Sequence, residues 1–143
     1  VGTIGCRLYY GDNTIQHGGI QLILTKDGRM AVTHKGIKTY YKASFNKEYD
    51  VLGSTGAFLM VNRDTFINIG GFDEGTSECM GDVILNIGCI VKKLKNIYLG
   101  DAVCYHYESV TRAKNPDKIE GERKDLTERL IPKEKRSRIL YQT

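Results

Sequence analysis

Long apolar runs are scarce in this chain of 143 residues. Its longest apolar stretches, residues 20–24 and 57–61, are far shorter than the roughly 18 residues that a membrane-spanning helix needs. The first residues, VGTIGCRLYY, have the pattern of a strand and not that of a signal peptide. We therefore expect no segment that crosses a bilayer. Because the chain opens on Val1, we also expect it to be part of a longer protein.

Paired cysteine motifs are missing as well. The four cysteines, Cys6, Cys79, Cys89 and Cys104, form no C-x-x-C pair, and an even count in a chain of this length does not by itself indicate disulfide bonds. We therefore expect free thiols in a reducing compartment, the cytoplasm.

Net charge is absent from residues 1–111, which hold eleven basic and eleven acidic side chains. Residues 112–143 hold ten basic and six acidic side chains, so this tail carries the whole net charge of +4. Its one aromatic residue is Tyr141, whereas a nucleic-acid-binding segment needs exposed aromatics between its basic residues, so we expect no nucleic-acid partner. Two interpretations remain: a solvated helix, or peripheral contact with anionic lipid head groups at the inner face of the membrane.

The composition, 41% hydrophobic and 27% charged, is that of one soluble globular domain. Strand patterns cover residues 1–10, 20–24, 51–62, 96–100 and 102–106. Lys26, Asp27 and Gly28 predict a hairpin turn, and residues 33–50 have no clear period and predict a long loop. His17 and His34 fall in a predicted turn and this loop, with no metal-ligand spacing around them, so we assign them no role.

Three segments predict helices. RDTFINI is preceded by Asn62 or Asp64 as a cap and followed by Gly70 and Gly71 as a stop signal. Residues 82–94 have apolar side chains at near-helical spacing, and residues 116–130 are charged and open on a proline.

The stretch GGFDEGTSECMGDV, residues 70–83, places four carboxylates after a Gly-Gly-Phe turn. They are Asp73, Glu74, Glu78 and Asp82. From the residues alone, this stretch is a solvated surface loop, a metal site or a part of an active site that accepts a proton. Asp82 also falls in the first turn of a predicted helix, where the helix dipole favours a carboxylate.

The order of three motifs resembles the second half of inverting family 2 glycosyltransferases of the GT-A fold. The motifs here are GDNTIQHGGI, GSTGAFLMVNRDTFINIGGFDE and DVILNIGCIVKKLKNIYLGDAVCYHYESVTR. Their counterparts in that family are D-G-T-I-Q-x-x-G, then G-A-x-L-M-V-R-R-x-x-F-x-x-x-G-G-F-D-E, then E-D-V-D-L-C-x-R and D-A-x-x-x-H-x-x-S-x-x-R. The resemblance covers residues 1 to about 112 and needs no gap from Gly70 to Arg112.

The resemblance implies roles for single residues. Asp82 matches the carboxylate that takes the proton of the acceptor hydroxyl, a task for which a group ionised at neutral pH is suited. His106 would lie near the diphosphate and its metal, and Arg112 would pair with phosphate. The residues implied for the acceptor or sugar are Gly56, Ala57, Asp73, Glu74 and Glu78. Each also has a structural interpretation, as a helix-start carboxylate, a turn residue, a locally bonded histidine or a site of tight packing.

The sequence departs from the family pattern in one helix. Gly81 replaces the Glu of E-D, Ile84 replaces the second Asp, and Gly88 replaces the Arg. No D-x-D motif occurs, so the Mn²⁺ or Mg²⁺ that neutralises the leaving diphosphate would be held mainly upstream of Val1.

We therefore expect an α/β protein, a partial GT-A (Rossmann-like) fold with a mixed sheet and flanking helices that lacks the N-terminal nucleotide-binding half. Residues 1–112 would form its acceptor side and residues 113–143 a basic helical tail. The whole enzyme would transfer a sugar, with inversion, from a nucleotide-sugar to a hydroxyl of a glycan or lipid-linked acceptor. This part alone would be inactive, and its open strand edges predict self-association. The alternative is a non-catalytic module that binds a glycan or a partner.

Overall fold

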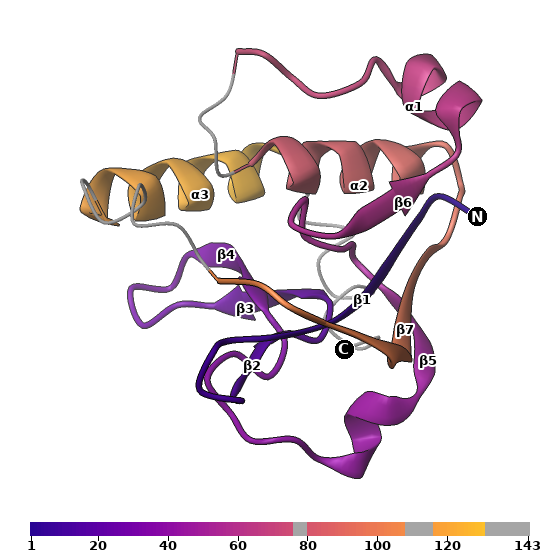
Figure 1. The fold of residues 1–143 in the computed structure, drawn as a ribbon. Helices are drawn as coiled ribbons and strands as arrows, with labels where there is room; N and C mark the ends of the chain where they lie inside the picture. The colour runs from indigo at the N-terminus through magenta and orange to yellow at the C-terminus, as the bar shows by residue number, and fades with distance from the viewer. Residues whose placement is uncertain (76–79, 108–115, 131–143) are drawn as a thin grey trace.

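The computed structural model describes residues 1–75, 80–107 and 116–130 and has a mixed α/β fold (Figure 1). Its main sheet has five strands in the order β2-β1-β7-β5, with β6 also paired to β1. β1 runs parallel to β7 and antiparallel to β2 and β6, and β5 runs antiparallel to β7. The strands are β1 (Thr3–Tyr9), β2 (Ile15–His17), β5 (Glu48–Val51), β6 (Leu59–Val61) and β7 (Asn96–Tyr105). This mixed sheet agrees with the predicted partial Rossmann-like fold.

A separate hairpin and three helices complete the described structure. The hairpin pairs β3 (Ile20–Leu24) with β4 (Met30–His34), and a short 3-10 helix, η1, covers Ala43–Asn46. The helices are α1 (Arg63–Ile69), α2 (Gly81–Val91) and α3 (Pro116–Leu130). Figure 1 shows the three helices together on one side of the strands, with α3 over the hairpin. No described helix is both long and apolar enough to cross a membrane.

The main apolar core lies between the hairpin, α2 and α3. Alternation along the strands directs Ile20, Leu22, Met30 and Val32 to one side of the hairpin, where they are buried. α2 contributes Val83 and Ile87 from its side, and Leu126 and Leu130 of α3 pack against the same cluster. α3 is thus part of the folded core, although the sequence predicts only a charged helix there.

The predicted helices are confirmed. Asn62 caps α1 by accepting hydrogen bonds from the backbone N–H groups of Asp64 (2.9 Å) and Thr65 (3.3 Å), and Gly70 ends it with a φ of 102°. α2 and α3 begin within one residue of their predicted starts. The strand at the N-terminus and the hairpin turn at Asp27 are confirmed too.

Four predictions for the strands and loops are wrong. Residues 51–62 do not form one strand, because the backbone at Ser54 bonds a side chain of α2 instead of a neighbouring strand. Residues 33–50 are not a plain loop, since they contain the end of β4, η1 and β5. His17 and His34 lie in β2 and β4 rather than in a turn and a loop. The two strands predicted over 96–106 form one strand with an irregular register.

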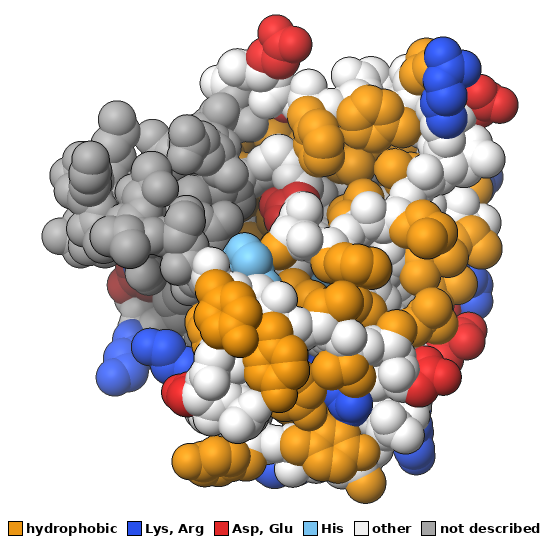
Figure 2. Space-filling model, viewed as in Figure 1, with side chains coloured by type: hydrophobic (Ala, Val, Ile, Leu, Met, Phe, Trp, Pro, Cys, Tyr) orange, Lys and Arg blue, Asp and Glu red, His pale blue; other side chains and the backbone are white. Residues whose placement is uncertain are grey.

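The described cysteines, Cys6, Cys89 and Cys104, are free thiols as predicted, and Cys79 lies outside the described residues. Large apolar side chains also reach the surface, and Figure 2 shows many of them on one face. Met60 is 63% exposed, Phe72 51% and Tyr105 52%.

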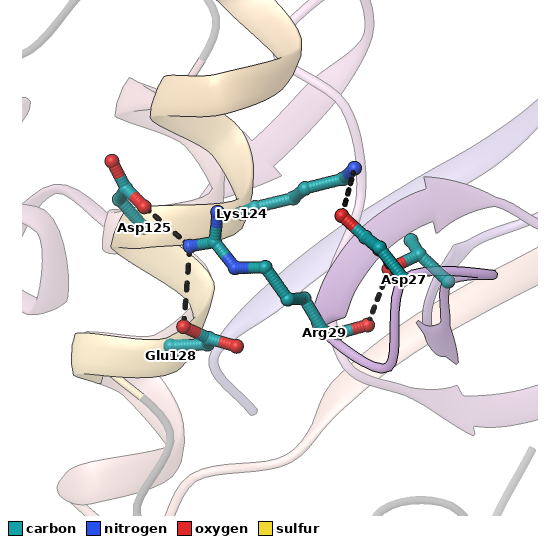
Figure 3. Close-up of polar contacts among 6 residues, drawn as sticks. Asp27, Arg29, Lys124, Asp125 and Glu128 are labelled. Carbon is teal, nitrogen blue, oxygen red and sulfur yellow. Dashed lines mark hydrogen bonds and ion pairs between the residues drawn. The ribbon is translucent and has the colours of Figure 1, made fainter.

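Ion pairs connect α3 to the turn of the hairpin (Figure 3). Arg29 contacts both Asp125 and Glu128, the latter at 3.2 Å, and Lys124 donates to Asp27 at 3.0 Å. Hydrogen bonds from Thr25 and then from Lys124 lower the pKa of Asp27 to about 2. Exposed pairs of this kind add little stability individually, so the apolar contacts of Leu126 and Leu130 contribute more to holding α3 in place.

Asp27 should therefore make the stability of the protein depend on acid pH. Its depressed pKa contributes stability that is complete above its ordinary value of about 3.9 and is lost as the pH falls through about 2. The difference in free energy of unfolding between wild type and Asp27→Asn should be full at pH 5 and vanish near pH 2, as measured by urea titration. A difference that stays constant over this range would show that the charge of Asp27 is not what matters.

Candidate functional site

Two buried asparagines join the segments that carry the predicted site. Asn86 of α2 is fully buried, and its side-chain N–H groups donate to the carbonyls of Ser54 (2.8 Å) and Asp82 (2.7 Å). Its side-chain oxygen accepts from the hydroxyl of Thr3 and from the backbone N–H of Ser54. Both donors and the acceptor of Asn86 are therefore used, so burial leaves none of its polar atoms unpaired.

Asn96, at the start of β7, extends this network. Its side-chain oxygen accepts from the backbone N–H of Thr3 at 2.9 Å, and its N–H groups donate to the carbonyls of Leu52 (2.8 Å) and Asn86 (2.9 Å). β1, the segment 52–54, α2 and β7 are thus tied at one point. A fully satisfied buried network of this kind specifies one arrangement of the elements that it joins.

Asp82 lies in the first turn of α2, as the sequence predicts, and its carboxylate is oriented by two backbone N–H groups. One oxygen accepts from Gly56 at 2.7 Å and the other accepts from Val83 at 2.8 Å. A Cβ atom at Gly56 would lie 3.5 Å from the Cβ of Asp82, so the backbone approaches this side chain closely. Asp82 is half-buried, and solvent therefore still reaches it.

His106 follows β7 and is held by Gln16 of β2. The imidazole Nδ1 lies 2.8 Å from the side-chain oxygen of Gln16, and the amide of Gln16 donates to the carbonyl of His106 at 3.2 Å. Because an amide oxygen only accepts, Nδ1 carries the proton, and in the neutral ring Nε2 is left as an acceptor. His106 is thus oriented with one nitrogen available to a ligand.

A chain of contacts links the surroundings of His106 to Asp82. Next to Gln16 in β2, His17 accepts a hydrogen bond at Nε2 from the backbone N–H of Thr55, at 3.4 Å. Thr55 precedes Gly56, which donates to Asp82. His17 is fully buried and packs edge to face on His34, with ring centroids 4.8 Å apart. His17 therefore positions the segment that holds Asp82 and is not itself accessible.

A second face of α2 is formed by the three residues at which the sequence departs from the family pattern. Gly81, Ile84 and Gly88 are spaced by three and four residues and so share one side of the helix, away from that of Asp82 and Asn86. A Cβ atom at Gly88 would lie 2.5 Å from Cγ2 of Ile69, and one at Gly81 would lie 3.6 Å from the ring of Phe72. The two glycines therefore let α1 and the turn after it approach α2.

A pocket of about 540 Å³ lies between α1 and this face of α2. Its lining consists of Ile69, Gly70, Gly71, Phe72, Asp73, Glu74, Ile84 and Gly88. Asp73 accepts a hydrogen bond from the backbone N–H of Gly75 at 2.8 Å, which fixes the turn, and both acidic residues are exposed. The volume lies within the usual range for small-molecule sites.

The structure thus brings together only some of the predicted site residues. Gly56 and Asp82 are in contact, Ala57 is exposed beside them, and Asp73 and Glu74 line a pocket on another face of α2. Glu78 and Arg112 lie outside the described residues. Among residues 1–75, 80–107 and 116–130, no three His, Cys, Asp or Glu side chains are close enough to hold a metal ion. His106 could supply one ligand, so these residues do not form a metal site by themselves.

Sequence reasoning missed the residues that assemble this region. Apart from the carbonyl of Asp82, the partners of Asn86 and Asn96 lie 10 to 93 positions away in the chain, and no local pattern reveals such partners. A polar residue in the apolar helix pattern DVILNIGCIV was the available signal for Asn86. For Gln16 and His17, the signal was their place within the motif GDNTIQHGGI.

Comparison with known proteins finds distant relatives. The chain is 27% identical over 116 residues to the O-antigen biosynthesis protein RfbC of Myxococcus xanthus, covering 78% of this chain and 9% of that protein. It is 28% identical over 114 residues to the uncharacterized protein y4gI of Sinorhizobium fredii (strain NBRC 101917 / NGR234), covering 78% of this chain and 12% of that protein. The chain therefore spans about a tenth of the length of these relatives. No family model and no solved structure matches it.

The packing of α1 on α2 gives a matched pair of glycine variants. Gly88→Ala should lower the free energy of unfolding by about 1 kcal/mol or more, because its methyl group would collide with Ile69. Gly121→Ala in α3 meets nothing within 4 Å and should raise it by about 0.5–1 kcal/mol through helix propensity. Thermal or urea unfolding measures both. A stabilising Gly88→Ala would contradict the close contact.

Burial of His17 should make stability depend on pH near neutrality. Burial, and then the neighbouring His34, lower the pKa of His17 well below its ordinary value. Below about pH 6.5, His17 binds a proton in the unfolded chain but stays neutral in the folded protein. The free energy of unfolding should therefore fall, as the pH falls, by up to about 1.4 kcal/mol per pH unit. Urea titrations from pH 7.5 to 5.5 should show a weaker dependence for His17→Gln than for wild type. Equal dependences would exclude His17 as the titrating group.

Proposed function

We propose that this chain is the acceptor-side part of an inverting family 2 glycosyltransferase of the GT-A fold. The whole enzyme would transfer a sugar from a nucleotide-sugar to a hydroxyl of a glycan or lipid-linked acceptor. The distant similarity to a protein named for O-antigen biosynthesis supports a glycosyltransferase-related region. The reaction, the fold family and the substrates go beyond that similarity and belong to this proposal.

The contact between Gly56 and Asp82 is the observation that carries the proposal. These residues are 26 positions apart, yet a 2.7 Å hydrogen bond joins them at the start of α2. The N–H groups of Gly56 and Val83 hold both carboxylate oxygens in place, and the side chain is still partly open to solvent. A carboxylate fixed in this way can accept a proton from a bound hydroxyl without first having to be ordered.

Most residues that line the pocket between α1 and α2 come shortly before Asp82 in the sequence. Its aromatic residue, Phe72, faces the position of Gly81, which directly precedes Asp82. An acceptor sugar in the pocket would therefore lie near the start of α2. We assign Asp73 and Glu74 to this acceptor site, and Gly56 and Ala57 to the sugar beside Asp82.

The proposed step is a single displacement. The acceptor oxygen forms a bond to the anomeric carbon of the donor while the bond between that carbon and the diphosphate oxygen breaks. The hydroxyl proton passes to Asp82, and the electron pair of the broken bond leaves with the nucleoside diphosphate. Attack opposite to the leaving group inverts the configuration at the anomeric carbon.

In this proposal, residues outside this chain would bind the divalent metal, Mn²⁺ or Mg²⁺. The described residues do not form a metal site, and His106 offers one nitrogen at most. No step is therefore assigned to a metal here. Because the donor site would lie outside as well, the 143 residues alone should not catalyse transfer.

The second candidate function is a non-catalytic module that binds a glycan or a partner. Gly81, Ile84 and Gly88 favour it, since that face of α2 packs against α1 and carries none of the charged groups of the family pattern. The two functions share the pocket and differ in whether Asp82 takes part in a reaction.

Further parts of the proposal concern location and assembly. We propose a cytoplasmic protein, with the basic tail in contact with the inner face of the membrane, although residues 131–143 lie outside the described structure. We also propose self-association through β6, which among the described strands pairs only with β1 and exposes Met60. A free strand edge with an apolar side chain is a site for pairing with another chain.

The full-length protein should transfer sugar from one member of a panel of nucleotide-sugars in the presence of Mn²⁺ or Mg²⁺. Asp82→Asn should lower kcat by about 10²–10⁴-fold, because an amide cannot take the hydroxyl proton. Asp64→Asn is the matched control, since Asp64 is also an acidic residue in the first turn of a helix. That variant should leave kcat unchanged. The measurement is the initial rate of nucleoside diphosphate release with acceptor present.

The outcomes separate the interpretations. If Asp82→Asn and Asp64→Asn both keep the wild-type rate, Asp82 is a helix-start carboxylate and the proton goes elsewhere. If wild type releases no nucleoside diphosphate from any donor, the binding module replaces the enzyme as the better interpretation.

A further inference from the structure

The lining of the pocket between α1 and α2 has two parts with different chemistry. Its helix side is apolar, formed by Ile69, Ile84 and the backbone of Gly88. Its turn side carries Phe72 with the carboxylates of Asp73 and Glu74. Among the described residues, no lysine, arginine or histidine lines the pocket. A ligand that fits must therefore offer an apolar surface and hydrogen-bond donors, without negative charge.

Phe72 is suited to contact a ligand ring. Its side chain is 51% exposed, and it packs edge to face on Phe66, with ring centroids 5.3 Å apart and an angle of 74°. Phe66 therefore holds the orientation of the Phe72 ring while part of its surface stays free. The C–H side of a sugar ring is a flat apolar surface that such a ring can cover.

The two carboxylates select against an anion. Ionised carboxylates only accept hydrogen bonds, so they can bind sugar hydroxyls but repel another carboxylate or a phosphate. Asp73 already uses one oxygen for the N–H of Gly75, which holds the group at the rim of the pocket. None of the described residues that line the pocket is basic.

The close packing of α1 on α2 keeps basic side chains out of this wall. Ile69 fills the space that a side chain at position 88 would need, since an added Cβ would lie 2.5 Å from its Cγ2. A long cationic side chain at Gly88 would require α1 to move away. At position 88, therefore, the helix packing itself excludes a cationic side chain from the pocket.

We propose that this pocket binds an uncharged sugar residue of the acceptor, packed on Phe72 with its hydroxyls toward Asp73 and Glu74, and excludes acidic sugars. The inference rests on the proposed function, because it names the class of acceptor for that reaction. It also predicts binding in the absence of any donor.

The test is saturation-transfer NMR on the full-length protein with two matched sets of ligands. The first set contains methyl glycosides of neutral hexoses and 6-deoxyhexoses, and the second contains the corresponding methyl uronides, which differ by one carboxylate. At least one neutral glycoside should bind, and its uronide should bind about two- to fivefold more weakly, the effect of one unfavourable charge pair near a surface.

Variants connect the binding to the pocket. Phe72→Ala should weaken neutral binding about tenfold or more, whereas Phe58→Ala, which removes a ring of similar exposure (46%) outside the lining, should leave it unchanged. Glu74→Lys should raise the affinity for the uronide and remove the preference for its neutral counterpart. A variant with a merely damaged fold would not gain uronide binding.

Three results would contradict the inference. These results are equal binding of neutral and acidic ligands, neutral binding that survives Phe72→Ala, and no binding of any neutral glycoside. Failure of the proposed function looks different. If the protein selects neutral glycosides as described but releases no nucleoside diphosphate, the pocket binds as inferred and the proposed enzymatic function is wrong. If it transfers sugar to an acidic acceptor, the proposed enzymatic function holds and the inferred selectivity of the pocket is wrong.

Discussion

The side chain of Asn86 is the point on which the described structure depends. From the middle of α2 it bonds Thr3 of β1, the backbone of Ser54 and the carbonyl of Asp82, and Asn96 links the same point to β7. Removing one partner would leave buried polar atoms without hydrogen bonds, which costs about 1–3 kcal/mol for each. The network therefore fixes α2 against the sheet, and with it the contact between Gly56 and Asp82.

Three faces of α2 contact three different parts of the structure. Asp82 and Asn86 face the segment after β5, Val83 and Ile87 face the hairpin and α3, and the face of Gly88 receives α1. Asp82 and the acidic pocket are therefore reached from different sides of one helix. A ligand that contacts both would have to lie across the start of α2, where Phe72 approaches Gly81.

The acidic stretch that follows the Gly-Gly turn separates into parts with different surroundings. Asp73 and Glu74 line the pocket, and Asp82 is bonded to Gly56. Their shared position in the sequence suggests one cluster of negative charge, but Asp73 bonds the N–H of Gly75, whereas Asp82 bonds those of Gly56 and Val83. Gly81, Ile84 and Gly88 act together, because small or apolar residues at this spacing allow α1 to pack closely.

The sequence by itself determined the local elements. The cap at Asn62, the stop at Gly70, the hairpin turn at Asp27 and the helical spacing after Asp82 are short-range signals, and the structure contains each of the elements they predict. Only the tertiary structure decided that Ser54 bonds α2 instead of a strand, that His17 is buried, and that α3 joins the core. These outcomes depend on contacts between residues distant in the chain, whose energies are comparable to local preferences and are not encoded in any one segment.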